Sequence, residues 1–259
     1  MADLSNKVFI VTGAASGMGL AAAKLLVTRN AFVGLCDINE SGLNSLVKDL
    51  DPQAKTRVLT GIVNVSSRPS VAAFFKATRE RFGKLNGFVN FAGVAGHHLG
   101  SENIWEISDD EYDHIMDANA KGAFNMLSEA LKPGVLEEGF VDSKPASSLV
   151  HVSSMFSVRG YIKGSVFTAS KHAAVGLVKS AAMEAGERGI RVNAVMPGAI
   201  DTPMRQKLID EDAPPPILFS PIERPGHPNE IASVVAFLLS DESSYVTGAL
   251  WGVDGGVNA

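Results

Sequence analysis

Cysteine is almost absent from this chain of 259 residues, because Cys36 is the only one. An intramolecular disulfide is therefore excluded, and the single thiol is compatible with a reducing compartment. The sequence also has no apolar run long enough to cross a membrane, and Asp3 stands where a signal peptide needs basic residues. These absences predict a cytoplasmic protein with no membrane partner.

Positive charge is also in short supply, with 23 Lys and Arg against 28 Asp and Glu. This balance argues against a nucleic-acid surface or an anionic membrane as the partner, and it leaves small molecules as the expected ligands. Hydrophobic residues make up 46% of the chain, which is enough for a large core. We expect a single domain over residues 1–259.

A glycine-rich turn follows the first apolar run of the chain. The run K-V-F-I-V-T ends at Gly13, and Gly17 and Gly19 open an Ala/Leu-rich helical segment. Missing side chains let backbone N–H groups and the helix N-terminus approach a pyrophosphate, so strand, turn and helix together predict a dinucleotide site. A glycine pattern alone would be a weak signal, since it also fits an ordinary tight turn.

Asp37 supports the dinucleotide interpretation. It ends the second apolar run, A-F-V-G-L-C, 18 residues beyond Gly19, close to the spacing of about 20 expected for an acid that binds the adenosine ribose. A carboxylate there accepts bonds from both ribose hydroxyls and repels a 2'-phosphate, so we expect NAD(H) as the cofactor. The alternative is a solvated acid that opens the next helix.

Lys171 shares an apolar helix face with residues three, four and seven positions away. These residues are Phe167, Ala174, Val175 and Val178. One explanation is a lysine whose stem packs while its ammonium group reaches solvent. The other is an ammonium group that serves a functional site.

Asn119 interrupts the apolar face of another helix, which Ser108 and Glu111 open at capping-box spacing. A buried amide must find partners or cost about 1–3 kcal/mol, and a local structural role would satisfy that rule. We expect no metal site at His97 and His98, because adjacent residues cannot easily converge on one ion. These histidines line the substrate mouth or are simply exposed to solvent.

Several motifs resemble those of the short-chain dehydrogenase/reductase family. That family carries Tyr-x-x-x-Lys on its catalytic helix and a serine thirteen residues before the tyrosine. Here F-T-A-S-K contains Lys171, and Ser154 lies thirteen residues before Phe167. The turn N-F-A-G and the sequence N-A-K-G at Asn119 resemble two further family motifs. Phe167 occupies the tyrosine position, so the family's proton donor is missing.

The resemblance covers essentially the whole chain. It implies an α/β fold with one doubly wound Rossmann-type domain, a parallel sheet of about seven strands and flanking helices. It also implies a homotetramer, or a homodimer. The implied cofactor contacts are Gly13, Ser16, Gly17, Met18, Gly19, Asp37, Asn64, Val65, Asn90, Ala92, Gly93, Lys171, Pro197, Gly198, Ile200 and Thr202.

The same resemblance implies catalytic roles for residues of three segments. They are Asn119, which would hold a proton-relaying water, Ser154, Phe167 and Lys171. The expected substrate contacts are Ser154, Met155, Phe156 and Met204. Seven of the twelve prolines lie between Pro203 and Pro228, which argues against sheet and most helix there. We interpret 203–228 as a substrate lid, and its apolar residues suggest an apolar or polycyclic substrate.

Three functions fit these observations. The first is an NAD-dependent oxidoreductase that interconverts a secondary alcohol and a ketone, whose tyrosine was deliberately replaced so that activity is severely reduced. The second is a natural dinucleotide-binding pseudoenzyme that acts as a sensor or scaffold, and the third is an isomerase or cyclase that needs no phenol. We favour the first, because everything around Phe167 fits it. Tyr161 lies six residues before Phe167 and cannot share its helical face, so we expect it to be a poor substitute donor.

Overall fold

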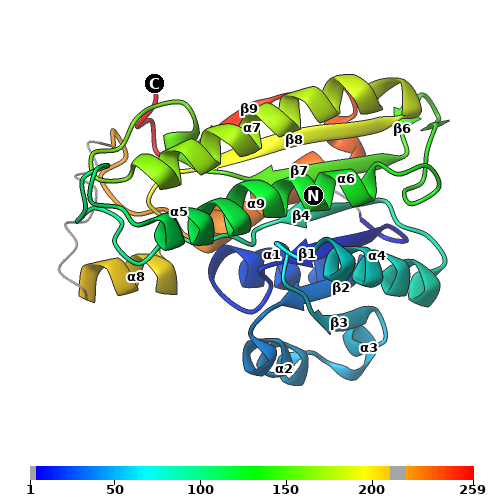
Figure 1. Cartoon of the computed structure of the whole chain (residues 1–259). Helices are drawn as coiled ribbons and strands as arrows, with labels where there is room; N and C mark the ends of the chain where they lie inside the picture. The colour runs from blue at the N-terminus through cyan, green and yellow to red at the C-terminus, as the bar shows by residue number, and fades with distance from the viewer. Residues whose placement is uncertain (1–3, 211–219) are drawn as a thin grey trace.

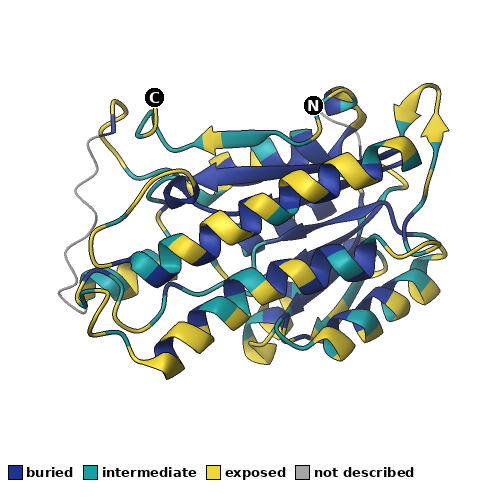
Figure 2. Cartoon of the chain, turned by 45° about the horizontal axis from the view of Figure 1, so that its top comes forward, coloured by how far each residue is buried: buried dark blue, intermediate teal, exposed yellow. Residues whose placement is uncertain are grey.

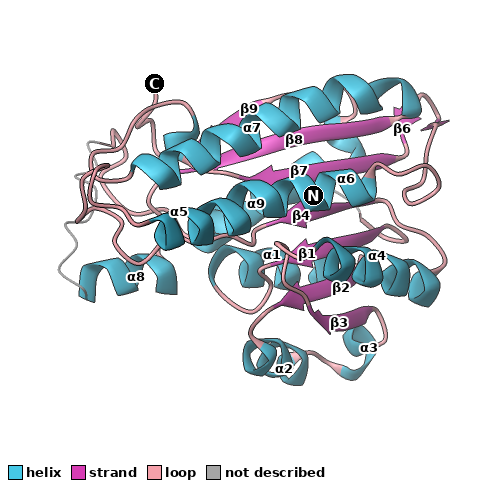
Figure 3. Ribbon diagram, in the orientation of Figure 1, coloured by secondary structure: helices cyan, strands magenta, loops and turns pink. Residues whose placement is uncertain are grey.

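Within residues 4–210 and 220–259, which the computed structural model describes, seven parallel strands form one central sheet (Figure 1 and Figure 3). Their order is β3, β2, β1, β4, β7, β8, β9. The strands are β1 (Val8–Thr12), β2 (Phe32–Asp37), β3 (Val58–Ile62), β4 (Gly87–Asn90), β7 (Ser147–Val152), β8 (Ile190–Pro197) and β9 (Leu250–Val253). The predicted doubly wound α/β sheet is confirmed.

Helices cover both faces of the sheet, and each face has its own apolar core. On one face lie α1 (Gly17–Thr28), α2 (Glu40–Asp49) and α9 (Pro228–Leu239). On the other face lie α4 (Arg68–Phe82), α6 (Gly122–Ala130) and α7 (Ser165–Ala185). Figure 2 shows these helices exposed on their outer sides and buried toward the sheet. This arrangement explains why the central strands are apolar on both faces.

The strand order reverses between β1 and β4. β1 pairs with β2 on one side and with β4 on the other, and β4 continues the sheet toward β7. In open parallel sheets, the carboxyl ends of the strands form a crevice at such a reversal, and ligands bind there. The glycine turn after β1 and the turn after β4 therefore face the same crevice.

Helix α4 illustrates how periodicity produces this packing. Its buried residues are Val71, Phe74, Phe75 and Thr78, at helical spacing, so one face of the helix packs against the sheet. The helix ends at Phe82, and the next residue, Gly83, has a φ of 79°, the left-handed conformation typical of a helix C-terminus.

The proline-rich segment contains more helix than its composition suggested. Residues Pro203–Asp210 form α8. Pro203 is tolerated because it is the first residue of the helix, where its missing N–H group costs no hydrogen bond. Residues 211–219 of the segment lie outside the described residues. The described remainder, 220–227, has no helix or strand, and the lid interpretation of 203–228 stays a prediction.

Smaller elements complete the fold. α3 (Pro52–Lys55) precedes β3, and α5 (Asp109–Met116) leads through a π-helical turn, Asp117–Lys121, into α6. The exposed connection before β7 contains a short antiparallel hairpin, β5 (Phe140–Val141) and β6 (Lys144–Pro145), which the sequence did not suggest. Across residues 4–210 and 220–259, no helix is both long enough and apolar enough to span a membrane.

Candidate active site

The glycine turn between β1 and α1 leaves no room for side chains. Gly13 and Gly17 have positive φ angles of 65° and 52°, which side-chain-bearing residues rarely adopt. A Cβ atom on Gly19 would lie 2.0 Å from the carbonyl oxygen of Gly13. Ser16, at the N-cap of α1, makes no side-chain hydrogen bond to the helix. The first N–H groups of α1 thus remain available to an anionic ligand.

Asp37 is held rigidly at the end of β2. Its two carboxylate oxygens accept hydrogen bonds from the backbone N–H groups of Ala15 and Asn39, each at 3.0 Å. Each oxygen keeps further acceptor capacity for a ligand hydroxyl. Ile38, beside it in the cleft, is 73% exposed and offers an apolar surface that sequence reasoning missed.

Most of the predicted site residues line two adjoining clefts. The first cleft is bordered by Gly13, Ser16, Gly17, Met18, Gly19, Asp37, Asn64, Val65, Ala92, Gly93, Thr202 and Met204. The second is bordered by Met18, Gly93, Ser154, Met155, Phe156, Phe167, Lys171, Pro197, Gly198, Ile200, Thr202 and Met204. Because they share Met18, Gly93, Thr202 and Met204, the two clefts form one continuous crevice.

Two predicted residues lie beneath this crevice instead of lining it. Asn90 is fully buried, and its side chain accepts a hydrogen bond from the Thr12 hydroxyl and contacts Nδ1 of His151 at 3.2 Å. This bonding connects the carboxyl ends of β1, β4 and β7. Burial lowers the pKa of His151 to about 3, with Lys171 adding to the effect, so the imidazole is neutral at physiological pH.

Asn119 is the second of these buried residues, and it occupies the π-helical turn between α5 and α6. Its Oδ1 accepts a bond from the Val94 N–H group at 2.8 Å, and its Nδ2 donates to the Val94 carbonyl and the Ser170 hydroxyl at 2.9 and 3.0 Å. The amide therefore fastens the loop after β4 to α7. Single π-helical turns within helices are frequent at functional sites.

Lys171 directs its ammonium group into the crevice. The residue is 7% exposed, and no described residue accepts a hydrogen bond from its Nζ. A Cβ atom on Gly93 would lie 3.4 Å from this nitrogen, so the glycine makes room for it. Burial lowers the pKa of Lys171 to about 8. The interpretation of Lys171 as a lysine whose stem packs while its ammonium group reaches solvent is therefore wrong. The ammonium group is available to a ligand acceptor.

The two adjacent serines at the end of β7 have different surroundings. The hydroxyl of Ser153 lies 2.6 Å from that of Ser157 and donates to the Lys171 carbonyl at 3.2 Å. The oxygen of Ser154 accepts a bond from the Phe156 N–H group at 3.2 Å, and no described residue accepts its proton. Ser154 also lines the crevice, so it is the serine able to donate to a substrate oxygen.

Phe167 faces the same crevice from the first turns of α7. The Lys171 Nζ lies 5.5 Å from the centroid of its ring, within the range of a cation–π contact. The ring of Phe156 meets it edge-on, with centroids 6.5 Å apart. The site therefore joins a free hydroxyl, a free ammonium group and an aromatic ring that carries no hydroxyl.

Tyr161 also lines this crevice, which the sequence argument did not anticipate. Tyr161 is not on the helix, because α7 begins at Ser165 and Tyr161 lies in the preceding turn. The helical-face argument against Tyr161 is therefore wrong. The available signal in the sequence was Gly164, the small residue against which the ring packs.

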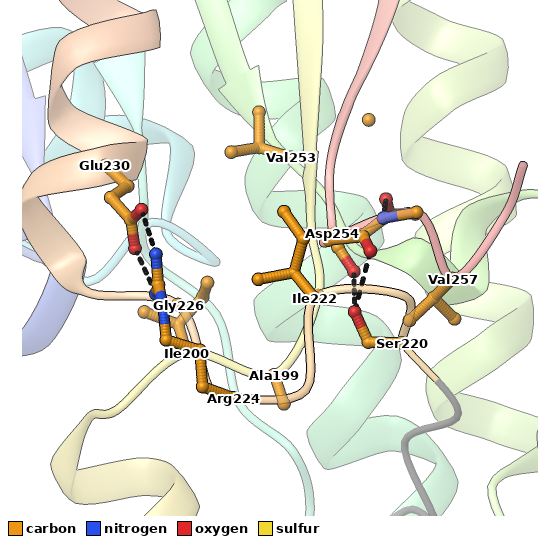
Figure 4. A pocket seen from close by; sticks show the side chains of 14 residues that line it. Ala199, Ile200, Ser220, Ile222, Arg224, Gly226, Glu230, Val253, Asp254 and Val257 are labelled. Carbon is orange, nitrogen blue, oxygen red and sulfur yellow. Dashed lines mark hydrogen bonds and ion pairs between the residues drawn. The ribbon is translucent and has the colours of Figure 1, made fainter.

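A further hollow lies beside Ala199 and Ile200, just beyond the end of β8 (Figure 4). Arg224 and Glu230 pair with each other there, and Ser220 bonds to the backbone. Arg224 donates to the two carboxylate oxygens of Glu230 at 2.8 and 2.9 Å, and the Ser220 hydroxyl donates to the Gly255 carbonyl at 2.8 Å. These bonds anchor the segment 220–227 between α9 and the end of β9.

The adjacent histidines lie at the edge of the site. Nδ1 of His97 is 2.7 Å from a carboxylate oxygen of Glu111, and its ring stacks on His114. His98 lines a small hollow behind Phe167. In the part of the chain that the structure describes, no group of three or more His, Cys, Asp or Glu side chains is placed to hold a metal ion.

Comparison with known proteins identifies the family. The family model described as enoyl-(acyl carrier protein) reductase matches residues 13–258. The chain is 39% identical over 258 residues to the short-chain dehydrogenase/reductase aba4 of Botryotinia fuckeliana (strain B05.10), covering 97% of this chain and 96% of that protein. The chain belongs to the short-chain dehydrogenase/reductase family.

Other family members agree in sequence and structure. A levodione reductase of Leifsonia aquatica is 37% identical over 264 residues, which cover 98% of this chain and 95% of that one. The crystal structure of levodione reductase matches with a TM-score of 0.84 and 34% identity over 98% of both chains. The family consists of oxidoreductases that bind a nicotinamide dinucleotide. The glycine turn, with its uncapped helix start, and the unpaired Lys171 fit such a ligand.

Proposed function

We propose that this protein is an NAD(H)-dependent oxidoreductase for a secondary alcohol and its ketone, and that Phe167 occupies the position of the catalytic tyrosine. The observation that carries the proposal is the grouping of Ser154, Phe167 and Lys171 around one crevice. Two of these side chains offer free hydrogen-bonding groups, and the third lacks only a hydroxyl. Activity is therefore expected to be severely reduced.

The chain provides holders for each part of the cofactor. The glycine turn and the N-terminus of α1 would bind the pyrophosphate, and Asp37 would accept bonds from the adenosine ribose. Lys171 would donate to the nicotinamide ribose, and Ile200 and Thr202 would bond the carboxamide. Asp37 disfavours a 2'-phosphate through charge repulsion, which supports NAD(H) over NADP(H).

When bound, a nicotinamide cofactor would supply or accept the hydride. The chain's own part is to orient the substrate and to move a proton. Ser154 would donate a hydrogen bond to the substrate oxygen, and in the family the lysine lowers the pKa of a neighbouring phenol so that it exchanges a proton at neutral pH. With Phe167 in place, Lys171 has no phenol to activate, and the proton must come from water or from Ser154.

The walls of the crevice support an apolar substrate. Met155, Phe156 and Phe167 form one side, and Met204 and Leu208 of α8 contribute another. The named relatives are reductases, one of levodione. An apolar or polycyclic ketone fits these surroundings, because burial of its skeleton provides affinity and Ser154 provides orientation.

The proposal is tested with a panel of secondary alcohols and ketones supplied with NAD(H). The protein and its Phe167→Tyr variant are compared by absorbance of the reduced nicotinamide. Turnover by the variant on at least one substrate, with little or none by the parent, supports the proposal. If the variant binds cofactor and ligand together but gains no turnover, a phenol-independent reaction is favoured instead. Tight cofactor binding without any ligand would favour a pseudoenzyme.

A further inference from the structure

The chain contains three tyrosines, and in the described chain only one of them lines the crevice. Tyr112 on α5 and Tyr245 are 46% and 102% exposed, on the outer surface. Tyr161 lies in the turn before α7 and borders the same cleft as Ser154 and Phe167. With Phe167 lacking a hydroxyl, the Tyr161 phenol is the one phenol within reach of a ligand in this crevice.

The ring of Tyr161 is fixed in place. It stacks on Phe156 with centroids 4.4 Å apart and an interplanar angle of 21°, and Phe156 itself is 5% exposed. A Cβ atom on Gly164 would lie 2.3 Å from Cδ1 of Tyr161, so the glycine allows the ring to pack against the backbone. A side chain fixed in this way loses little entropy when it binds a ligand.

The phenol of Tyr161 has no partner among the described residues. Burial raises its pKa, so the group stays protonated and can donate a hydrogen bond. No aspartate or glutamate is among the described residues that line this cleft. The hydroxyl oxygen is accessible and not buried, so it can exchange water for a ligand acceptor in the cleft.

Tyr161 does not occupy the position of Phe167. Phe156 contacts both aromatic rings, stacking on Tyr161 and meeting Phe167 edge-on at 6.5 Å. Phe167 stands on α7, whereas Tyr161 lies in the turn before that helix. Its raised pKa is also the opposite of what a proton-exchanging phenol needs.

We infer that Tyr161 is a specificity-determining residue that donates a hydrogen bond to a second, uncharged oxygen of the substrate. The inference rests on the proposed function. The substrate class is thus a ketone or secondary alcohol that carries another carbonyl or hydroxyl on the same apolar skeleton. Ser154 binds the reacting oxygen and Tyr161 the second one, which fixes the orientation of the skeleton between them.

The test uses the Phe167→Tyr form, with and without Tyr161→Phe. Each form is assayed on two cyclic ketones of one carbon skeleton, one with a single carbonyl and one with a second carbonyl or hydroxyl. Tyr161→Phe should raise KM for the second ketone by about three- to tenfold, the effect of one neutral hydrogen bond, and leave kcat and the simple ketone unchanged. Tyr245→Phe is the matched control and should change neither substrate.

Ligand binding without turnover separates the two proposals. Calorimetry on the parent chain with NADH bound should show the same selective loss of affinity on Tyr161→Phe. If the simple ketone is turned over by Phe167→Tyr but Tyr161→Phe affects both ketones equally or neither, the inference is overturned and the proposed function stands. If no ketone binds or reacts in any form, both are overturned.

Discussion

One end of the crevice is shaped mainly by backbone atoms and the other mainly by side chains. At the dinucleotide end, the fit depends on backbone, because Gly19 cannot accept even a methyl group without meeting the Gly13 carbonyl at 2.0 Å. At the reaction end, the fit depends on side chains from separate elements, including Ser154 after β7 and Lys171 on α7. The two ends therefore tolerate substitution very differently.

A backbone site cannot change its chemistry without changing its shape, whereas a side-chain site can. Phe167 has the outline of a tyrosine, keeps its contacts with Phe156 and Lys171, and lacks one oxygen. In the proposed function, the crevice keeps its form and lacks only a proton donor. A side-chain site can therefore lose its chemistry without losing its shape.

The largest effect is expected at the backbone end. Gly19→Ala places a Cβ atom against the Gly13 carbonyl, so the turn must move, NAD binding should become unmeasurable, and stability should fall by about 1–3 kcal/mol. Isothermal calorimetry and thermal unfolding measure both effects. Gly176→Ala is the control, because no atom lies within 4 Å of its Cβ position. Normal NAD binding by Gly19→Ala would contradict the backbone account.

A smaller effect is expected at Lys171. Lys171→Met keeps the bulk of the side chain and removes its charge, so NAD affinity should fall by about 10- to 100-fold, the value of a charged hydrogen bond of roughly 1.5–3 kcal/mol. Lys179→Met, on an exposed position of the same helix, should have no effect. Equal affinities for the parent and Lys171→Met would show that the ammonium group does not bind the cofactor.

The pKa of Lys171 adds a pH signature to this comparison. The pKa of Lys171 is about 8 in the folded protein, below the ordinary value of 10.5. Between these two pH values, Lys171 is protonated in the unfolded chain but not in the folded one. Stability should therefore rise with pH over this range, while NAD affinity falls as the ammonium group loses its proton. Both trends should disappear in Lys171→Met, as followed by thermal unfolding and calorimetry.

The smallest effect is expected for cofactor choice at Asp37. Repulsion between its carboxylate and a 2'-phosphate is worth on the order of 1–4 kcal/mol, so NADH should bind at least about tenfold more tightly than NADPH. Asp37→Asn should narrow this gap while keeping an oxygen for the Ala15 N–H group. Equal or tighter NADPH binding by the parent chain, measured by calorimetry, would exclude the proposed role of Asp37.

Sequence reasoning located the backbone features better than the side-chain constellation. The glycines and Asp37 follow apolar runs, so strand ends and spacing were enough to place them in one crevice, and helical spacing placed Lys171. The partners of Asn119 depend on a π-helical turn that local periodicity does not encode. Tyr161 was missed because α7 begins only at Ser165, so Tyr161 lies in the turn before the helix. The buried position of Asn90 likewise follows from strand pairing across the sheet.

The central claim is that the reaction end is complete except for one hydroxyl, and a single-turnover measurement tests it most directly. The parent chain and Phe167→Tyr are each saturated with NADH and the same ketone, and the loss of reduced-nicotinamide absorbance is followed. Restoring the general acid should accelerate this step by about 10²- to 10⁴-fold, with no loss of thermal stability. Equal rates in the two proteins, with both ligands shown to be bound, would contradict the account.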